Sequence, residues 1–134
     1  MDISQRDHRA LKRLLSDIEL FSRHVIEKPL RPYQLEPARA ILESVLKRQG
    51  RTFSIMMARQ AGKNELSAHL EAFLLTLFQR TGGTLVKAAP TFRPQARISM
   101  RRLETVLENR WSAGRWQRSE DHRLRLGQAE IAFL

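Results

Sequence analysis

Two short apolar runs flank a long segment with helical spacing near the middle of the chain. The runs, residues 52–57 and 84–89, have the length and composition of buried strands. The segment between them, 64–80, is apolar around much of its circumference and is followed by Gly82-Gly83, which predicts a deeply buried helix that ends there. A strand, a helix and a second strand in this order predict a parallel α/β unit with a right-handed crossover.

Helical spacing also marks segments on both sides of this unit. Apolar residues predict a helix over 6–27, which ends before a stretch with two prolines. Pro37 is suited to the first turn of a second helix, which ends near Gly50. Pro94 opens a further helix whose apolar positions extend as far as Trp111.

The last residues are typical of a β-hairpin, with one strand at 122–126 and another at 129–134. The chain has 134 residues, of which 42% are hydrophobic and 28% are charged, which is the balance of a globular protein with about one domain. We therefore expect an α/β fold with a helical N-terminal element over 1–29 and a main domain over 30–134.

Basic residues outnumber acidic residues throughout the chain. There are 24 Lys and Arg residues against 14 Asp and Glu residues, and because five of the 24 are lysines, 19 are arginines. The net charge of +10 favours a polyanionic partner, although a basic surface also serves solubility. The chain has no cysteine, which excludes disulfides, thiolate zinc sites and cysteine nucleophiles.

The sequence shows no sign of membrane insertion or export. The N-terminus lacks the basic start and apolar run of a secretory signal. The most apolar stretch, 72–78, is far shorter than the roughly 20 residues that a membrane-spanning helix needs. We expect a cytoplasmic protein with no membrane partner.

The loop between the first expected strand and its helix has the position of a phosphate-binding loop. Its sequence is Met57-Ala58-Arg59-Gln60-Ala61-Gly62-Lys63-Asn64. Gly62 would allow close approach of the backbone, and Lys63 would reach the β- and γ-phosphates. Two positions depart from the G-x-x-x-x-G-K-[ST] pattern, because Met57 replaces the first glycine and Asn64 replaces the hydroxyl residue that touches Mg²⁺. The alternative is a plain strand-to-helix turn with Asn64 as the N-cap; the expected strands on both sides favour the phosphate-binding loop.

Residues 59–65 resemble the variant Walker A motif of the large terminase subunits of tailed bacteriophages, which has R-Q-x-G-K without the first glycine. Residues 30–34 are similar to the adenine-recognising Tyr-Gln element that precedes this motif in terminases and related helicases. Residues 87–96 resemble the family's next strand with its A-A-P-T loop, and 126–134 resemble the hairpin that follows. The similarity covers roughly residues 28–134, in the family's order.

The resemblance implies a partial P-loop NTPase fold of the RecA-like (ASCE) type with a partly formed parallel sheet, and it implies specific roles in the loop. Gln34 would hydrogen-bond the adenine edge with Tyr33 packed nearby, Lys63 would stabilise phosphate charge, and Arg59 would act as an arginine finger in cis. Asn64 would coordinate Mg²⁺ directly or through water. The implied nucleotide-binding residues are Tyr33, Gln34, Arg59, Gln60, Ala61, Gly62, Lys63 and Asn64.

The family's function is to drive double-stranded DNA into a phage prohead with ATP and Mg²⁺. The resemblance therefore implies the nucleotide-binding N-terminal portion of this DNA-packaging motor, in the cytoplasm of a bacterial host. Through the full-length parent, it also implies the small terminase subunit and the portal protein as partners.

None of the 14 carboxylates fits the Walker B aspartate or the catalytic glutamate that an ATPase also needs. Asp121 follows polar residues, Glu130 precedes its apolar run, and Glu104 and Glu108 are expected on a charged helix face. The four histidines lack metal-ligand spacing. We therefore expect that the chain is the part of the ATPase domain that precedes Walker B, and that it binds nucleotide without hydrolysing ATP by itself.

Two alternatives remain open from the sequence. One is a fragment of a helicase-like DNA-translocating ATPase, where the Tyr-Gln element also occurs. The other is a small basic nucleic-acid-binding protein without nucleotide chemistry. Arginines beside Trp111 and Trp116 are typical of surfaces that stack on nucleic-acid bases. The favoured alternative is that Trp111 closes a helix core and that the residues after it form a solvated connector. Arg97, Arg101 and Arg102 suit DNA phosphate and equally suit ion pairs with glutamates on the same helix.

Overall fold

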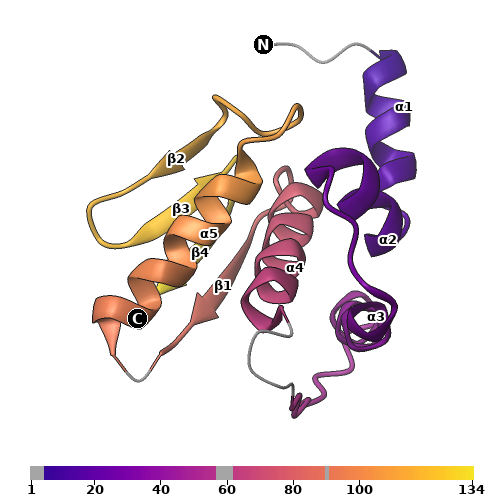
Figure 1. Cartoon of the computed structure of the whole chain (residues 1–134). Coiled ribbons are helices and arrows are strands. Elements are labelled where there is room, and N and C mark those ends of the chain that lie inside the picture. Colours follow the sequence, from indigo (N-terminus) through magenta and orange to yellow (C-terminus); the bar gives the residue numbers. More distant parts are fainter. Residues whose placement is uncertain (1–4, 57–61, 90) are drawn as a thin grey trace. The chain divides into compact units, whose positions relative to one another are not determined.

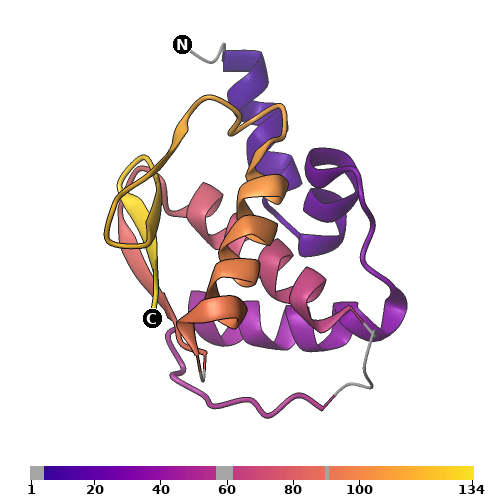
Figure 2. The same ribbon diagram turned by 60° about the vertical axis from the view of Figure 1, so that its left-hand side comes forward.

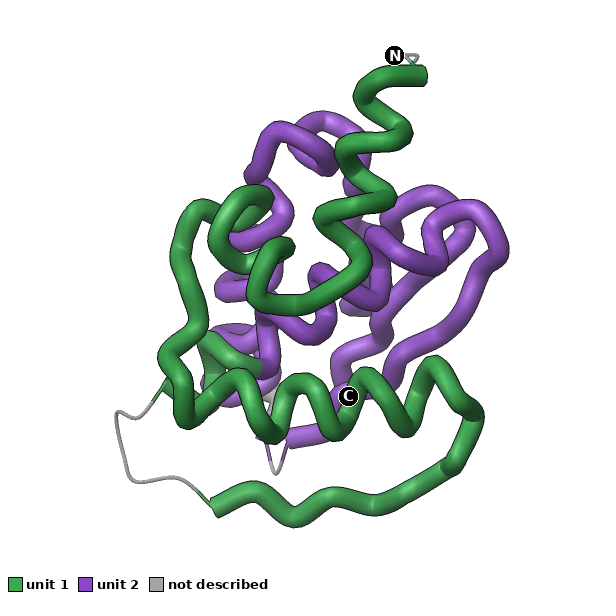
Figure 3. Tube along the Cα trace, turned by 90° about the vertical axis from the view of Figure 1, so that its right-hand side faces the viewer, with its two compact units in different colours: residues 1–66 green, residues 67–134 purple. Residues whose placement is uncertain are grey.

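The computed structural model describes residues 5–56, 62–89 and 91–134, and in these ranges the chain forms five α-helices, two π-helical segments and a four-stranded sheet (Figure 1). The chain divides into two compact units, residues 1–66 and 67–134 (Figure 3). The division at residues 29 and 30 that the sequence suggested stays a prediction. No helix in the described ranges is long and apolar enough to cross a bilayer.

The first unit is helical. Its elements up to residue 56 are α1 (Gln5–Leu14), α2 (Ile18–Phe21), the π-helical segment η1 (Ser22–Ile26) and α3 (Pro32–Leu46). The prediction of one continuous helix over 6–27 is wrong, because the chain breaks between α1 and α2. Ser16 Oγ donates to the Arg13 carbonyl oxygen at 2.6 Å, and Asp17 has extended backbone with φ −154°. Short polar side chains bond to nearby backbone groups and so compete with the helical hydrogen bonds.

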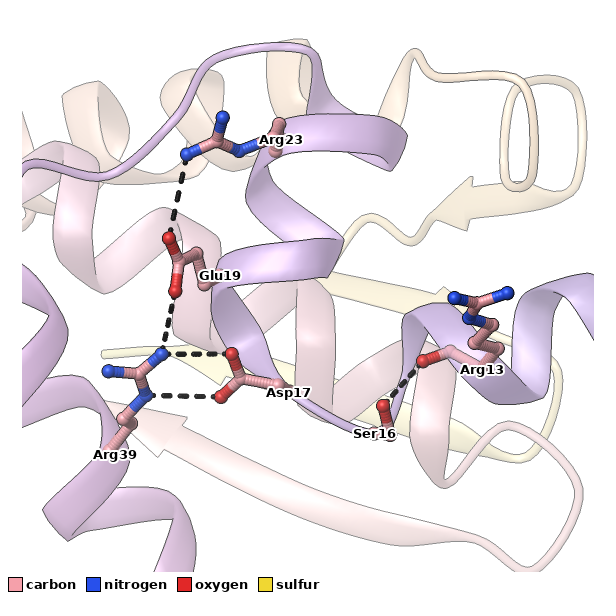
Figure 4. A network of polar contacts seen from close by, with 6 residues as sticks. All are labelled: Arg13, Ser16, Asp17, Glu19, Arg23 and Arg39. Carbon is pink, nitrogen blue, oxygen red and sulfur yellow. Dashed lines mark hydrogen bonds and ion pairs between the residues drawn. The ribbon is translucent and has the colours of Figure 1, made fainter.

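An arginine on α3 joins this helix to the start of α2 (Figure 4). Arg39 Nε and Nη2 donate to the two carboxylate oxygens of Asp17 at 3.1 and 3.0 Å, and Nη2 also donates to Glu19 at 2.8 Å. The hydrogen bond from Arg39 lowers the pKa of the Asp17 carboxyl. Arg23 extends the network with a 3.5 Å contact to Glu19. The planar guanidinium thereby fixes how α2 lies against α3.

Pro32, rather than Pro37, occupies the first position of α3. The preset φ of proline suits the first helical position, where its missing N–H has no intrahelical acceptor. The helix therefore starts earlier than the sequence predicted, and Pro37 lies one turn further inside.

Residues 51–56, all of which the structure describes, form no strand, so the prediction of a buried strand over 52–57 is wrong. Phe53 is exposed and Met56 is 96% exposed. An apolar run becomes a strand only where a neighbouring strand pairs with its N–H and C=O groups, and composition does not supply that neighbour. Met57 lies outside the described residues.

Helix α4 (Lys63–Leu77) confirms the helix predicted over 64–80, apart from an end that lies three residues earlier. Residues 68–76 are all buried, which confirms the deep burial expected from its apolar circumference. His69, Glu71 and Thr76 are polar members of this buried stretch.

The second unit contains the sheet. Its strands are β1 (Gly83–Lys87), β2 (Trp116–Arg118), β3 (Arg123–Leu126) and β4 (Ala129–Phe133), in the order β1-β4-β3-β2. The C-terminal hairpin is confirmed by the antiparallel pair β3·β4, and the three-residue β2 was not predicted. β1 and β4 pair in parallel, so the sheet is mixed rather than parallel, and the parallel partner of β1 is β4 rather than residues 52–57.

Strand β1 is less buried than predicted for 84–89. Within the described sheet it lies at an edge, and Val86 is 64% exposed. β4 lies between β1 and β3, and its residues Ile131, Ala132 and Phe133 are buried. Pairing on both sides, rather than apolar composition, distinguishes the buried strand.

The connection from β1 to β4 includes α5 (Arg97–Leu107), which lies across one face of the sheet (Figures 1 and 2). The single helix predicted from Pro94 to Trp111 is instead kinked at Arg93, whose backbone is extended, within the segment η2 (Phe92–Ala96), and α5 ends at Leu107. The residues of α5 that are buried are Met100, Leu103, Val106 and Leu107.

Glu104 of α5 and Glu108, which caps the end of this helix, both interact with β2. Glu104 lies 3.5 Å from Arg118, and Glu108 accepts a 2.7 Å hydrogen bond from Trp116 Nε1. The salt-bridged face that the sequence suggested within the helix stays a prediction. Trp111 is buried just beyond the helix, as expected for a residue that closes its core.

Candidate functional site

The Tyr-Gln element and the glycine of the candidate loop contact each other within the first unit. The Gln34 side chain is 4% exposed, and its Nε2 donates to the Gly62 carbonyl oxygen at 3.0 Å. Its Oε1 accepts the Arg31 backbone N–H at 2.8 Å, which caps the start of α3. One buried amide therefore links the beginnings of two helices across 28 positions of sequence.

Gly62 is the N-cap of α4. Its carbonyl oxygen accepts the Leu66 N–H at 2.9 Å in addition to the bond from Gln34. Its φ is +80°, and a Cβ added there would lie 2.5 Å from Gln34 Nε2. A glycine is needed here both for the left-handed backbone and for the close approach of Gln34. Asn64 lies at the second helical position, so the alternative in which Asn64 is the N-cap is wrong.

Lys63 and Asn64 occupy the first turn of α4 with exposed side chains. The first N–H groups of a helix have no intrahelical acceptor, and the helix dipole places partial positive charge there. With the Lys63 ammonium added, this end of α4 is suited to an anion. Three predicted site residues, Arg59, Gln60 and Ala61, lie outside the described residues.

Tyr33 lies beside Gln34 on the first turn of α3 and is 47% exposed. Its hydroxyl oxygen accepts a 2.9 Å hydrogen bond from Arg31 Nη1. At the start of α4, Glu65 lies 3.6 Å from Lys28. The described part of the predicted site thus brings Tyr33, Gln34, Gly62, Lys63 and Asn64 into the same region of the first unit.

A second polar cluster, which the sequence analysis did not find, lies in the second unit between α4 and β1. Lys87 Nζ donates to Glu71 Oε2 at 2.8 Å and to Ser67 Oγ at 2.9 Å, and Ser67 Oγ donates to Glu71 Oε2 at 2.5 Å. Glu71 is 8% exposed, and among the described residues its Oε1 has no hydrogen-bond partner. Burial raises the pKa of the Glu71 carboxyl despite the opposing charge of Lys87.

The sequence contained one signal of this cluster. Ser67 and Glu71 are four residues apart, which places a hydroxyl and a carboxyl on one side of an otherwise apolar helix. Their partner Lys87 comes from a strand, and no local pattern predicts that contact.

The described residues offer no ready metal centre. In residues 5–56, 62–89 and 91–134, no three His, Asp or Glu side chains are grouped to hold a metal ion. Asn64 is the predicted Mg²⁺ ligand. In that role its side-chain oxygen would bind the ion, and phosphate oxygens and water would supply the remaining ligands, as is common for Mg²⁺. Comparison of the chain with protein-family models, with curated proteins and with solved structures gives no match.

Proposed function

We propose that this chain binds the phosphates of ATP with Mg²⁺ at the start of α4, in a partial P-loop-like domain similar to the N-terminal ATPase portion of phage terminase large subunits. The observation that carries the proposal is the 3.0 Å hydrogen bond between Gln34 Nε2 and the Gly62 carbonyl oxygen. It joins the two motifs of the resemblance, which lie far apart in sequence, at one helix N-terminus.

The chemistry of the proposed site is electrostatic. The 15-residue α4 has its positive end and its first N–H groups at Lys63, whose side chain adds a full charge. Arg59 would stabilise charge on the γ-phosphate, and Gln60, Ala61 and Gly62 would contribute backbone N–H groups. Asn64 would hold Mg²⁺.

The burial of Gln34 modifies the role that the resemblance implies for it. Its two polar atoms already bond to Arg31 and Gly62, and the side chain is almost inaccessible. We therefore assign Gln34 to holding the loop glycine in place, and we assign contact with the base to the exposed ring of Tyr33.

The architecture supports a P-loop-like arrangement in part. β1 and β4 form a parallel pair whose connection includes α5, as in folds that alternate strands and helices. Residues 51–56, which precede the loop, form no strand, so the proposal for nucleotide binding rests on the start of α4.

We propose nucleotide binding without hydrolysis by this chain. Glu130, the carboxylate of β4, accepts ion pairs from Arg123 at 2.9 Å and Arg125 at 3.0 Å, and so lacks the environment of a Walker B acid. Double-stranded DNA, the small terminase subunit and the portal protein are partners proposed on the resemblance alone.

The first test is thermal unfolding with and without Mg-ATP, in the wild type, in Lys63→Ala and in Lys12→Ala. A ligand that binds only the folded state, at about 100 times its Kd, stabilises the protein by about 2.7 kcal/mol. We expect ATP to raise the Tm of the wild type and of Lys12→Ala, which removes an exposed lysine of α1, and to have little effect on Lys63→Ala.

Equal shifts in Lys63→Ala and Lys12→Ala would contradict the proposed site. An absence of any shift, together with salt-sensitive DNA binding unaffected by ATP, would support the small basic nucleic-acid-binding protein instead. ATP turnover that Lys63→Ala abolishes would contradict the proposal that this chain binds without hydrolysis.

A further inference from the structure

A basic hollow of about 330 Å³ lies in the second unit, between the start of α5 and the turn that joins β2 to β3. Arg93 and Arg97 line it from the helical side, and Arg118 lines it from the end of β2. The remaining lining residues are Met100, Ser119, Glu120 and His122. We call this hollow the arginine hollow.

Two of its arginines carry unbalanced charge. Within the described residues, neither Arg93 nor Arg97 has an ion-pair partner, and both side chains are exposed. Arg118 forms an ion pair with Glu104 at 3.5 Å. Among the residues that line the hollow, Glu120 is the acidic one. The residues that line the hollow therefore carry an excess of positive charge, because three arginines from η2, α5 and β2 stand against one glutamate.

A second hollow of the same volume shows that arginine content alone does not make such a site. It shares Arg118 and Ser119 with the arginine hollow, and its other lining residues are Gln117, Asp121, Arg123, Arg125 and Glu130. Arg123 lies 2.8 Å from Asp121 and 2.9 Å from Glu130, and Arg125 lies 3.0 Å from Glu130. The guanidinium groups of Arg123 and Arg125 are therefore already paired with carboxylates, whereas those of Arg93 and Arg97 are not paired with a carboxylate of the described residues.

We propose that the arginine hollow binds a phosphate group. Guanidinium groups donate paired hydrogen bonds to phosphate oxygens, and arginines on separate elements can contact one phosphate from different directions. Ser119, which also lines the hollow, donates its hydroxyl to Asp121 Oδ1, so the donors left for a phosphate are those of the arginines. The phosphate belongs either to a free anion or to the backbone of a polynucleotide, and the experiment separates these two sources. This inference is independent of the nucleotide site proposed at α4.

The test compares Arg97→Gln with Arg101→Gln, which removes the same charge from an exposed position of the same helix outside the hollow. Binding of a fluorescein-labelled single-stranded oligodeoxynucleotide is measured by polarisation over a range of salt concentrations, with inorganic phosphate as competitor. Each variant is first checked for an unchanged circular dichroism spectrum and melting curve.

We expect Arg97→Gln to weaken binding about tenfold, as the loss of a charge-assisted hydrogen bond does, and Arg101→Gln to weaken it far less. The slope of log K against log salt is negative. Its magnitude should be smaller in Arg97→Gln by about 0.7 for each phosphate of the single strand that this variant no longer binds. Arg93→Gln should have the same effect, and Lys63→Ala should have none.

Competition by inorganic phosphate that depends on Arg97 would identify a free anion as a sufficient ligand. Oligonucleotide binding without such competition would identify the phosphodiester backbone as the source. Equal losses in Arg97→Gln and Arg101→Gln, or no binding of either probe by the wild type, would overturn the proposal. A failed ATP shift at α4 would leave it intact, because the two tests use different variants and ligands.

Discussion

At the scale of single residues, the pair Gln34 and Gly62 carries the strongest local constraint on the candidate site. The glutamine amide uses one polar atom for Arg31 and the other for Gly62, in a buried position. Removing either partner of a buried hydrogen bond leaves an unsatisfied group, which costs about 1–3 kcal/mol. The backbone conformation at Gly62 and the stability of the first unit therefore depend on the same contact.

Gly62→Ala should destabilise the protein more than Gly50→Ala. Both glycines have positive φ, for which a side chain costs roughly 1–2 kcal/mol, but the added Cβ meets Gln34 Nε2 at 2.5 Å only at position 62. At Gly50 nothing lies within 4 Å. Urea unfolding of both variants measures the difference in the free energy of unfolding.

The double variant Gln34→Ala/Gly62→Ala is the control for this prediction. Since alanine at position 34 removes the clashing amide, the two substitutions should cost less together than the sum of their separate costs. Strict additivity would show that the Gln34 contact does not determine the cost at Gly62.

At the scale of elements, the buried Glu71 joins α4 to β1 through Lys87. An ion pair in this environment contributes little net stability, because the loss of hydration offsets the attraction. The raised pKa of Glu71 shows that desolvation is the larger effect. The folded protein consequently binds this proton more tightly than the unfolded chain does.

This difference predicts how stability depends on pH. The contribution of Glu71 is most favourable below its unfolded pKa of about 4.3, and it declines as the pH rises through the higher folded pKa. Glu71→Gln cannot lose a proton, so its stability relative to the wild type should rise with pH across this window and then level off. Urea unfolding at a series of pH values measures the difference.

Glu36→Gln, at an exposed position of α3, is the matched control. It removes the same charge without a buried partner, so its difference from the wild type should change less with pH. A pH-independent difference for Glu71→Gln would show that the folded and unfolded chains hold this proton equally well.

At the scale of the whole molecule, two compact units contain different kinds of structure. The first is helical in its described part apart from residues 51–56 and the short connections, and the second contains the mixed sheet with α5. β4 is paired on both sides and buried, whereas β1 is exposed over much of its surface. The core of the second unit therefore centres on β4 and β3.

Ile131→Ala on β4 should destabilise the second unit by about 2–5 kcal/mol, the usual cost of a large-to-small change in a core. Val86→Ala on the exposed part of β1 should cost less than about 1 kcal/mol. Thermal unfolding followed by circular dichroism measures both. Similar losses for the two variants would contradict the central position of β4.

The sequence by itself determined the elements whose signals are local. Helix α4 follows from its apolar periodicity, and the β3·β4 hairpin follows from two short runs around a tight turn. The Gly-Lys pair at a helix start also came from local pattern, since a helix N-terminus is defined by its neighbours in the chain.

Only the tertiary structure decided the features that depend on distant partners. Residues 52–56 have the composition of a strand and do not form one, and the parallel partner of β1 is the last strand of the chain. The Gln34–Gly62 bond spans 28 positions and the Glu71–Lys87 bond spans 16. Strand pairing and burial are properties of contacts between segments, so a residue's own neighbours in sequence do not encode them.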